Sequence, residues 1–111
     1  MVKKREMTVL DVLVQVRDLL KVKKRWAQCG MAFDTQNKPV LSKSLDAVRW
    51  CILGAIQKES PTLRLYDKVT RIFNNISEKG IEEVNDAYGH KPIMRLIDIA
   101  IKNEREGRNM Q

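Results

Sequence analysis

The chain has 111 residues, of which 43% are hydrophobic and 32% charged, with a formal net charge of +7. This length corresponds to one domain, and the composition is that of a globular protein rather than a disordered one. A chain of this size buries roughly two-thirds of its unfolded surface, so its core needs no metal or disulfide. We expect a single domain over residues 1–111, with an ordered core at about 8–102 and polar, frayed ends at 1–7 and 103–111.

Several classes of protein are excluded by simple counts. No apolar stretch approaches the roughly 18 residues that a membrane span requires, and polar residues within 11–18 interrupt what would be the apolar part of a secretion signal. Cys29 and Cys51 are too few for a disulfide framework, and His90 alone cannot complete a zinc site with them. We therefore expect a cytoplasmic protein that has no metal or cofactor and contacts no membrane.

The first predicted helix spans about residues 8–25, where apolar residues recur at spacings of three and four. Thr8 is a suitable N-cap, and Asp11 lies in the first turn, where the helix dipole favours a carboxylate. Residues 1–25 hold eight Lys and Arg against three Asp and Glu, whereas the remainder holds thirteen against eleven. Most of the net charge thus belongs to this segment. Four cations fall on one arc beside the apolar stripe and are called here the basic flank: Arg17, Lys21, Lys24 and Arg25.

Residues 26–41 have no helical period, and Thr35 to Pro39 has the composition of a turn. We expect a short, irregular β-hairpin around residues 30–41. In this hairpin Phe33 and Val40 would face the core.

The second predicted helix begins at Ser42 or Ser44 and ends near Lys58. Residues 50–56 are apolar on all sides of this helix, which is typical of a helix covered by several neighbours. A ridge of small side chains would let another helix approach closely: Ala47, Cys51 and Gly54.

The remaining chain predicts two further helices and one short turn of helix. Ser60-Pro61 combines a cap with a first-turn proline, and Gly80 lies beyond the end of that helix. One further helical turn is expected at residues 81–84 and a loop at 85–89, and Pro92 opens the last helix. Four to five helices with short connections indicate a mainly α, compact, bundle-like domain.

Four short motifs form a pattern: Trp26-Ala27-Gln28, Asn37-Lys38-Pro39-Val40, Trp50-Cys51-Ile52-Leu53-Gly54-Ala55 and Asn85-Asp86. Together they resemble a family of small uncharacterised proteins from bacterial and phage genomes. The chain departs from the family pattern at Cys29, where a glycine is expected, and at Val84, where a tryptophan is expected. The resemblance covers about residues 9–102. It implies the extent and origin of the domain, and it implies no activity.

Two constellations of polar residues are candidate sites. Cys51, His90 and Asn85 are the residue types of a thiol hydrolase, but a thiol in an apolar helix is disfavoured as a thiolate. Asp46, Asn85 and Asp86, with His90 near them in sequence, are candidates for a polar or divalent-cation site. The alternative is that the loop residues bond the backbone, that Asp46 faces the start of its helix, and that His90 caps the last helix.

The basic flank, followed directly by Trp26, is the candidate site for an acidic protein surface or a nucleic acid. An aromatic residue beside a basic cluster is a modest signature of nucleic-acid binding. The alternative is a solvated face whose cations complement the helix dipole. The sequence contains no phosphate-binding glycine loop and no recognisable nucleic-acid reader module.

The expected function is that of a non-enzymatic accessory protein of phage or mobile-element type, which binds a macromolecular partner through its basic surface. One specific form is an inhibitor of a host defence or regulatory complex. The first alternative is a direct nucleic-acid-binding protein. The second is a small enzyme or ligand-binding domain that uses Cys51, Asp86 and His90.

Overall fold

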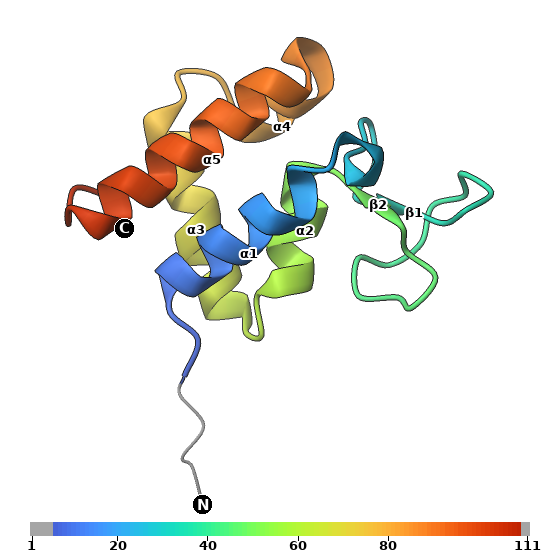
Figure 1. Ribbon diagram of the computed structural model, residues 1–111, viewed down its shortest axis with the longest axis horizontal. Coiled ribbons are helices and arrows are strands. Elements are labelled where there is room, and N and C mark those ends of the chain that lie inside the picture. The colour runs from blue at the N-terminus through green and yellow to red at the C-terminus, as the bar shows by residue number, and fades with distance from the viewer. Residues whose placement is uncertain (1–5, 110–111) are drawn as a thin grey trace, which may run out of the picture.

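A computed structural model describes residues 6–109 of the chain (Figure 1). The prediction of a mainly α, bundle-like domain with a small β-hairpin is confirmed. Over the described residues the helices are α1 (Val9–Leu20), α2 (Ile52–Glu59), α3 (Leu63–Ile76), α4 (Ile81–Glu83) and α5 (His90–Arg105). The remaining elements are the 3-10 turn η1 (Lys23–Arg25), the strands β1 (Ala32–Phe33) and β2 (Arg49–Trp50), and the π-helical segment η2 (Val84–Tyr88). Of the polar ends predicted to fray, 1–7 and 103–111, residues 1–5 and 110–111 lie outside the described residues.

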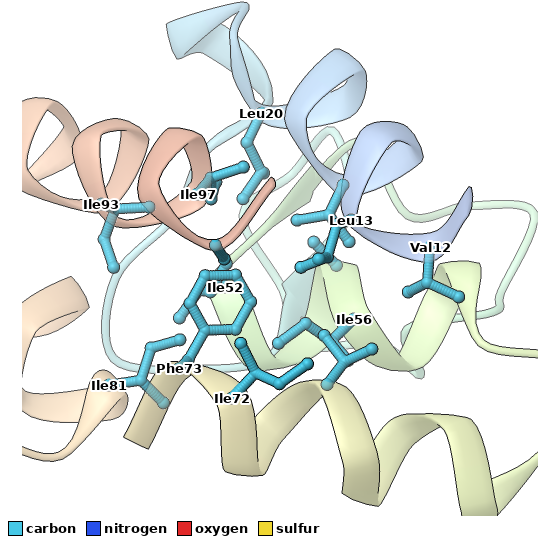
Figure 2. Packing of buried hydrophobic residues seen from close by; sticks show 14 of the residues in the cluster. Val12, Leu13, Leu20, Ile52, Ile56, Ile72, Phe73, Ile81, Ile93 and Ile97 are labelled. Carbon is cyan, nitrogen blue, oxygen red and sulfur yellow. The ribbon is translucent and has the colours of Figure 1, made fainter. Parts of the chain in front are cut away.

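The helices pack around one apolar core. α1 crosses the centre of the molecule, with α5 on one side and α2 on the other (Figure 1). Figure 2 shows Phe73 of α3 surrounded by isoleucines from α2, α3, α4 and α5. The long helices α1, α3 and α5 each bury one apolar face in this core. Within residues 6–109, no helix combines the length and the apolar character needed to cross a membrane.

The start of α1 agrees with the boundary predicted from the sequence, whereas its end does not. Thr8 Oγ1 accepts a hydrogen bond from the Asp11 N–H at 3.1 Å, and Asp11 Oδ2 accepts one from the Thr8 N–H at 2.9 Å. This reciprocal pair is a capping box. The α-helix ends at Leu20 rather than at 25, because Val22 is extended and residues 23–25 form the tighter η1. Residues after Arg25 form hydrogen bonds with distant parts of the chain, such as the bond from the Ala27 N–H to the Trp50 carbonyl. These tertiary contacts override the local preference for a helix.

The second predicted helix begins ten residues late, at Ile52 rather than at Ser42. Residues 41–48 instead form a loop, in which Ser44 Oγ accepts a hydrogen bond from the Asp46 N–H at 3.1 Å. Ser44 thus closes a local turn rather than capping a helix. Cys51 takes the N-cap position, and its Sγ accepts a hydrogen bond from the Gly54 N–H at 3.3 Å.

The predicted hairpin around residues 30–41 is present, closed by a bridge between Phe33 and Pro39. Its first strand also pairs with a strand from outside that range. β1 and β2 are antiparallel, with Ala32 opposite Trp50 and Phe33 opposite Arg49. Residues placed in the second helix by sequence therefore complete a small sheet. Between the two strands the chain makes two loops that extend away from the helices (Figure 1).

Three further boundaries differ from the prediction. α3 begins at Leu63 with Thr62 as its N-cap, while Ser60 ends α2 by donating its N–H to the Ile56 carbonyl. The predicted loop at 85–89 is largely the π-helical η2. α5 continues to Arg105, and Asn109 Nδ2 then donates back to the Ala100 carbonyl at 2.8 Å.

Candidate functional site

Asn85 lies at the centre of a buried hydrogen-bond network, and its side chain is only 1% exposed. Its Oδ1 accepts hydrogen bonds from Trp26 Nε1 at 2.8 Å and from the Ile52 N–H at 3.0 Å. Its Nδ2 donates to the Ala27 carbonyl at 2.9 Å and to Asp86 Oδ1 at 3.0 Å. An asparagine side chain has two donors and two acceptor lone pairs, and all four are used here.

Asp86 and Gln28 extend this network. Asp86 Oδ1 also accepts a hydrogen bond from the Cys29 N–H at 2.9 Å. Gln28 Nε2 donates to the Asp86 carbonyl at 3.0 Å and to the Asn85 carbonyl at 3.4 Å. We call the set Trp26, Gln28, Asn85 and Asp86 the Asn85 network. Two motifs of the resemblance, separated by almost 60 residues, thus meet in one structural contact.

The π-helical η2 makes this arrangement possible. The Gly89 N–H donates to the Val84 carbonyl at 3.3 Å, which closes a turn wider than that of an α-helix. The wide turn directs the side chains of Asn85 and Asp86, although consecutive, toward residues 26–29. Gly89 ends the segment with φ of 102°, a conformation that glycine adopts without strain.

Asp46 does not join the other residues of the proposed polar site. Its side chain is exposed on the 41–48 loop, and no hydrogen bond in the described structure connects it with Asn85 or Asp86. Over residues 6–109, no three His, Cys, Asp or Glu side chains converge as metal ligands do. Asn85 and Asp86 instead bond the backbone, as the structural alternative predicted.

His90 begins α5 and bonds the end of α1. Its Nε2 lies 2.7 Å from the Leu20 carbonyl oxygen, and its ring centroid lies 5.4 Å from that of Trp26. A carbonyl only accepts hydrogen bonds, so Nε2 carries the proton. The imidazole thus ties α5 to α1, and no hydrogen bond of the described residues connects it with Cys51.

The two cysteines occupy opposite environments. Cys51 is buried at the start of α2, and Cys29 is exposed. Burial raises the pKa of the Cys51 thiol above its ordinary value, so the nucleophilic thiolate is disfavoured at neutral pH. The thiol acts as a helix cap in the core.

Thiol reactivity tests this assignment. With an aromatic disulfide reagent under native conditions, we expect Cys29 to react readily and Cys51 to react at least about a hundredfold more slowly, because Cys51 requires local unfolding. The rates are measured by absorbance, with Cys29→Ser and Cys51→Ser identifying each phase. A native Cys51 that reacted as fast as Cys29 would instead favour the enzyme alternative.

The structure divides the basic flank into two parts. Arg17 and Lys21 each lie 3.6 Å from Asp18 Oδ1, so one carboxylate partly neutralises both. Lys24 and Arg25 lie in η1 beside Lys23, and all three are exposed. We call these three residues the cationic turn. None of them forms an ion pair with a carboxylate of residues 6–109.

Lys23 is the cation that helical periodicity missed. An ideal helix places it on a different arc from Lys24 and Arg25, whereas the 3-10 turn makes all three neighbours on one exposed turn. Arg25 also lines a shallow hollow with Asp18 and Glu59, at more than ion-pair distance from both carboxylates. The run of three consecutive basic residues, Lys23 to Arg25, is the feature of the sequence that could have indicated this cluster.

The two tryptophans have structural contacts. Trp26 is half-buried, with its Nε1–H bonded to Asn85 and its ring against His90. Trp50 is buried and donates its Nε1–H to the Ser42 carbonyl at 2.9 Å. Trp50 is therefore part of the core.

A second surface feature was not predicted from the sequence. A groove of about 440 Å³ lies between the 41–43 segment and the connection from α2 to α3. Its lining is mainly apolar and consists of Met31, Leu41, Ser42, Lys43, Gln57, Ser60, Pro61, Thr62, Leu63 and Tyr66. Because the sequence pattern placed Leu41 just before a helix and Leu63 within one, it gave no reason to bring them together.

Comparison with known proteins gives a family without an assigned activity. No curated protein and no solved structure matches the chain. The model of a family of unknown function, DUF6197, matches residues 4–103, a span that includes the whole Asn85 network. The bacterial and phage origin stays a prediction. Since the match covers nearly the entire chain, this protein belongs to the DUF6197 family of unknown function.

Proposed function

We propose that this protein is a non-enzymatic accessory protein that binds an acidic protein surface through its cationic turn, aided by Lys21. The observation that carries the proposal is the exposure of Lys23, Lys24 and Arg25 without an ion-pair partner among residues 6–109. Unpaired cations on one turn attract an acidic surface and accelerate its association. An inhibitor of a host defence or regulatory complex, acting in the cytoplasm, is the specific form of this proposal.

Two sets of contacts support binding over catalysis. Cys51 caps α2 from a buried position, and His90 bonds the Leu20 carbonyl. Asp86 accepts hydrogen bonds from the Cys29 N–H and from Asn85 Nδ2. Each residue of the enzyme alternative thus has a structural task, and none directs a free reactive group toward another.

The state of Trp26 supports a protein partner over a nucleic acid. A base-binding aromatic residue needs an open ring face. Trp26 is half-buried, packs against His90 and donates its N–H to Asn85. The Trp26 indole is therefore engaged in contacts within the protein, which favours a protein partner over a nucleic acid that stacks on this ring.

Charge reversal of the cationic turn tests the proposal. Lys23→Glu, Lys24→Glu and Arg25→Glu together should weaken partner binding by at least about tenfold, because repulsion replaces attraction. The matched control is Arg71→Glu, Lys91→Glu and Arg95→Glu, which changes three exposed cations elsewhere by the same total charge. Partners are captured from lysate of the source cells with and without nuclease treatment, and affinity is measured with the purified partner.

The possible outcomes separate the alternatives. Loss of the partner in the first variant, with retention in the control, supports the proposal. Equal loss in both variants would show that net charge alone drives association. Recovery that disappears after nuclease treatment would favour the nucleic-acid alternative, which is then measured by anisotropy with short DNA and RNA at two salt concentrations.

A further inference from the structure

The groove between residues 41–43 and the α2–α3 connection has exposed leucines on its walls. Leu41 is 82% exposed and Leu63 is 74% exposed, and Met31 adds further apolar surface beside them. Burying an exposed leucine is favourable because it removes apolar surface from water, so two leucines that border one groove can both contribute to binding. Scattered single leucines are ordinary on a protein surface, whereas two that border the same mainly apolar groove form a candidate interaction site.

The backbone of the loop that carries Leu41 is anchored by hydrogen bonds. The Ser42 carbonyl accepts the Trp50 Nε1–H at 2.9 Å, and Lys43 Nζ donates to the Ser60 carbonyl at 2.9 Å. Farther along the same loop, the Val48 N–H donates to the Phe33 carbonyl at 2.8 Å. The loop that carries Leu41 is thus fixed at both ends. A preformed groove loses less conformational entropy when a ligand binds.

The rim of the groove is cationic. Lys43 lines one wall. Beyond Thr62 the groove continues into a second hollow that is lined by Arg64 and Lys68, with Glu6 as its acidic residue. In the described structure none of these three cations forms an ion pair with a carboxylate. An apolar floor with a positive rim is complementary to a ligand that is apolar on one face and acidic on the other.

The extent of this surface, which covers two adjoining hollows, favours a peptide over a small molecule. The 440 Å³ groove alone is within the range of small-ligand pockets. Leu41 and Leu63 rise largely out of it, however, and the cationic rim extends along the first two turns of α3 through Arg64 and Lys68. A helix covers such a surface with apolar side chains spaced three and four residues apart. A second copy of this chain is disfavoured by its net charge of +7.

We propose that this groove binds an acidic amphipathic helix of a partner protein, with the apolar face of that helix between Leu41 and Leu63 and its carboxylates against Lys43, Arg64 and Lys68. This inference goes beyond the proposed function, since the groove and the cationic turn share no residue.

The test uses a labelled synthetic peptide with leucines at helical spacing on one face and glutamates on the other. We expect binding with a Kd of about 10–100 μM, and at least about tenfold weaker binding of a scrambled peptide of the same composition. Leu41→Ser with Leu63→Ser should weaken binding by at least about tenfold. The control Ile99→Ser, which changes an exposed residue of α5, should leave it unchanged.

Charge variants complete the experiment. Arg64→Glu with Lys68→Glu should weaken the peptide complex and reduce its salt dependence. Reversal of the cationic turn should leave peptide binding within about twofold, so the two proposals fail independently. Equal binding of the scrambled peptide, or tighter binding of a lysine version, would overturn the inference. A dimer that Leu41→Ser with Leu63→Ser dissociates in sedimentation would identify a second copy as the occupant and overturn it as well.

Discussion

Replacing Asn85 by alanine is expected to lower the free energy of unfolding by about 4 kcal/mol, close to the whole stability of many small domains. The change leaves the Trp26 Nε1–H and the Ile52 N–H without the oxygen they share, and the Ala27 carbonyl without its donor. Each buried polar group left unpaired costs about 1–3 kcal/mol. Urea unfolding followed by tryptophan fluorescence measures the loss.

Two further variants separate hydrogen bonding from side-chain volume. Asn103→Ala on α5 is the control, because its side chain makes no hydrogen bond in the described structure, and it should change stability by less than about 0.5 kcal/mol. Asn85→Asp keeps the shape and the acceptor but removes the donor to Ala27, and it places a carboxylate beside Asp86. It should destabilise the fold nearly as much as Asn85→Ala. A stable Asn85→Asp protein would contradict the role given to the amide.

Gly54→Ala is expected to destabilise the protein by about 3 kcal/mol or more, although alanine is normally the better helix former. A Cβ at this position would lie 1.9 Å from the Met31 carbonyl oxygen. That carbonyl accepts the Cys51 N–H at 3.2 Å, and the next residues form β1, so the backbone there has little freedom to retreat. Thermal unfolding followed by circular dichroism measures the effect.

The control for this substitution is Gly80→Ala. A Cβ at Gly80 would meet no atom within 4 Å, and its backbone conformation suits any residue. Alanine there should be neutral or stabilise by up to about 1 kcal/mol, because it restricts the unfolded chain. If both glycine variants behaved alike, the close approach of the Met31 carbonyl to α2 would be wrong.

Periodicity predicted the long helices because each has one apolar face that must be buried. The Thr8 cap and the apolar faces of α1, α3 and α5 were therefore readable from the sequence. The second helix was placed too early because residues 45–56 are apolar enough to suit either a helix or a covered strand. Tertiary contacts decide between the two: Ala32 pairs with Trp50, and the 41–48 loop bonds Phe33.

The prediction that a ridge of small side chains permits the close approach of another helix was correct only in part. Gly54 does mark a close approach, but its neighbour is the backbone of a loop at Met31 rather than another helix. A glycine in a helix indicates that another part of the protein approaches closely, but it does not indicate whether that part is a helix, a strand or a loop.

The contacts within the Asn85 network could not be predicted from the sequence, for a different reason. The resemblance singled out Trp26, Gln28 and the pair Asn85-Asp86, yet nothing in the spacing of these residues predicts that they touch. The π-helical turn that brings them together has no known periodic signature, and its amino-acid composition is typical of a loop. The sequence predicted that Asn85 and Asp86 would form hydrogen bonds with backbone groups, but it did not predict which groups.

The distance along the chain between Trp26 and Asn85 sets an order of events during synthesis. The hydrogen bond between them spans 59 positions, so residues 26–29 emerge from the ribosome long before their partners exist. Until η2 follows, the Trp26 indole and the Ile52 amide have no shared acceptor. Synthesis of η2 is thus the step that locks the irregular segment between α1 and α2, and a nascent chain stalled before Asn85 would remain a substrate for chaperones or proteases.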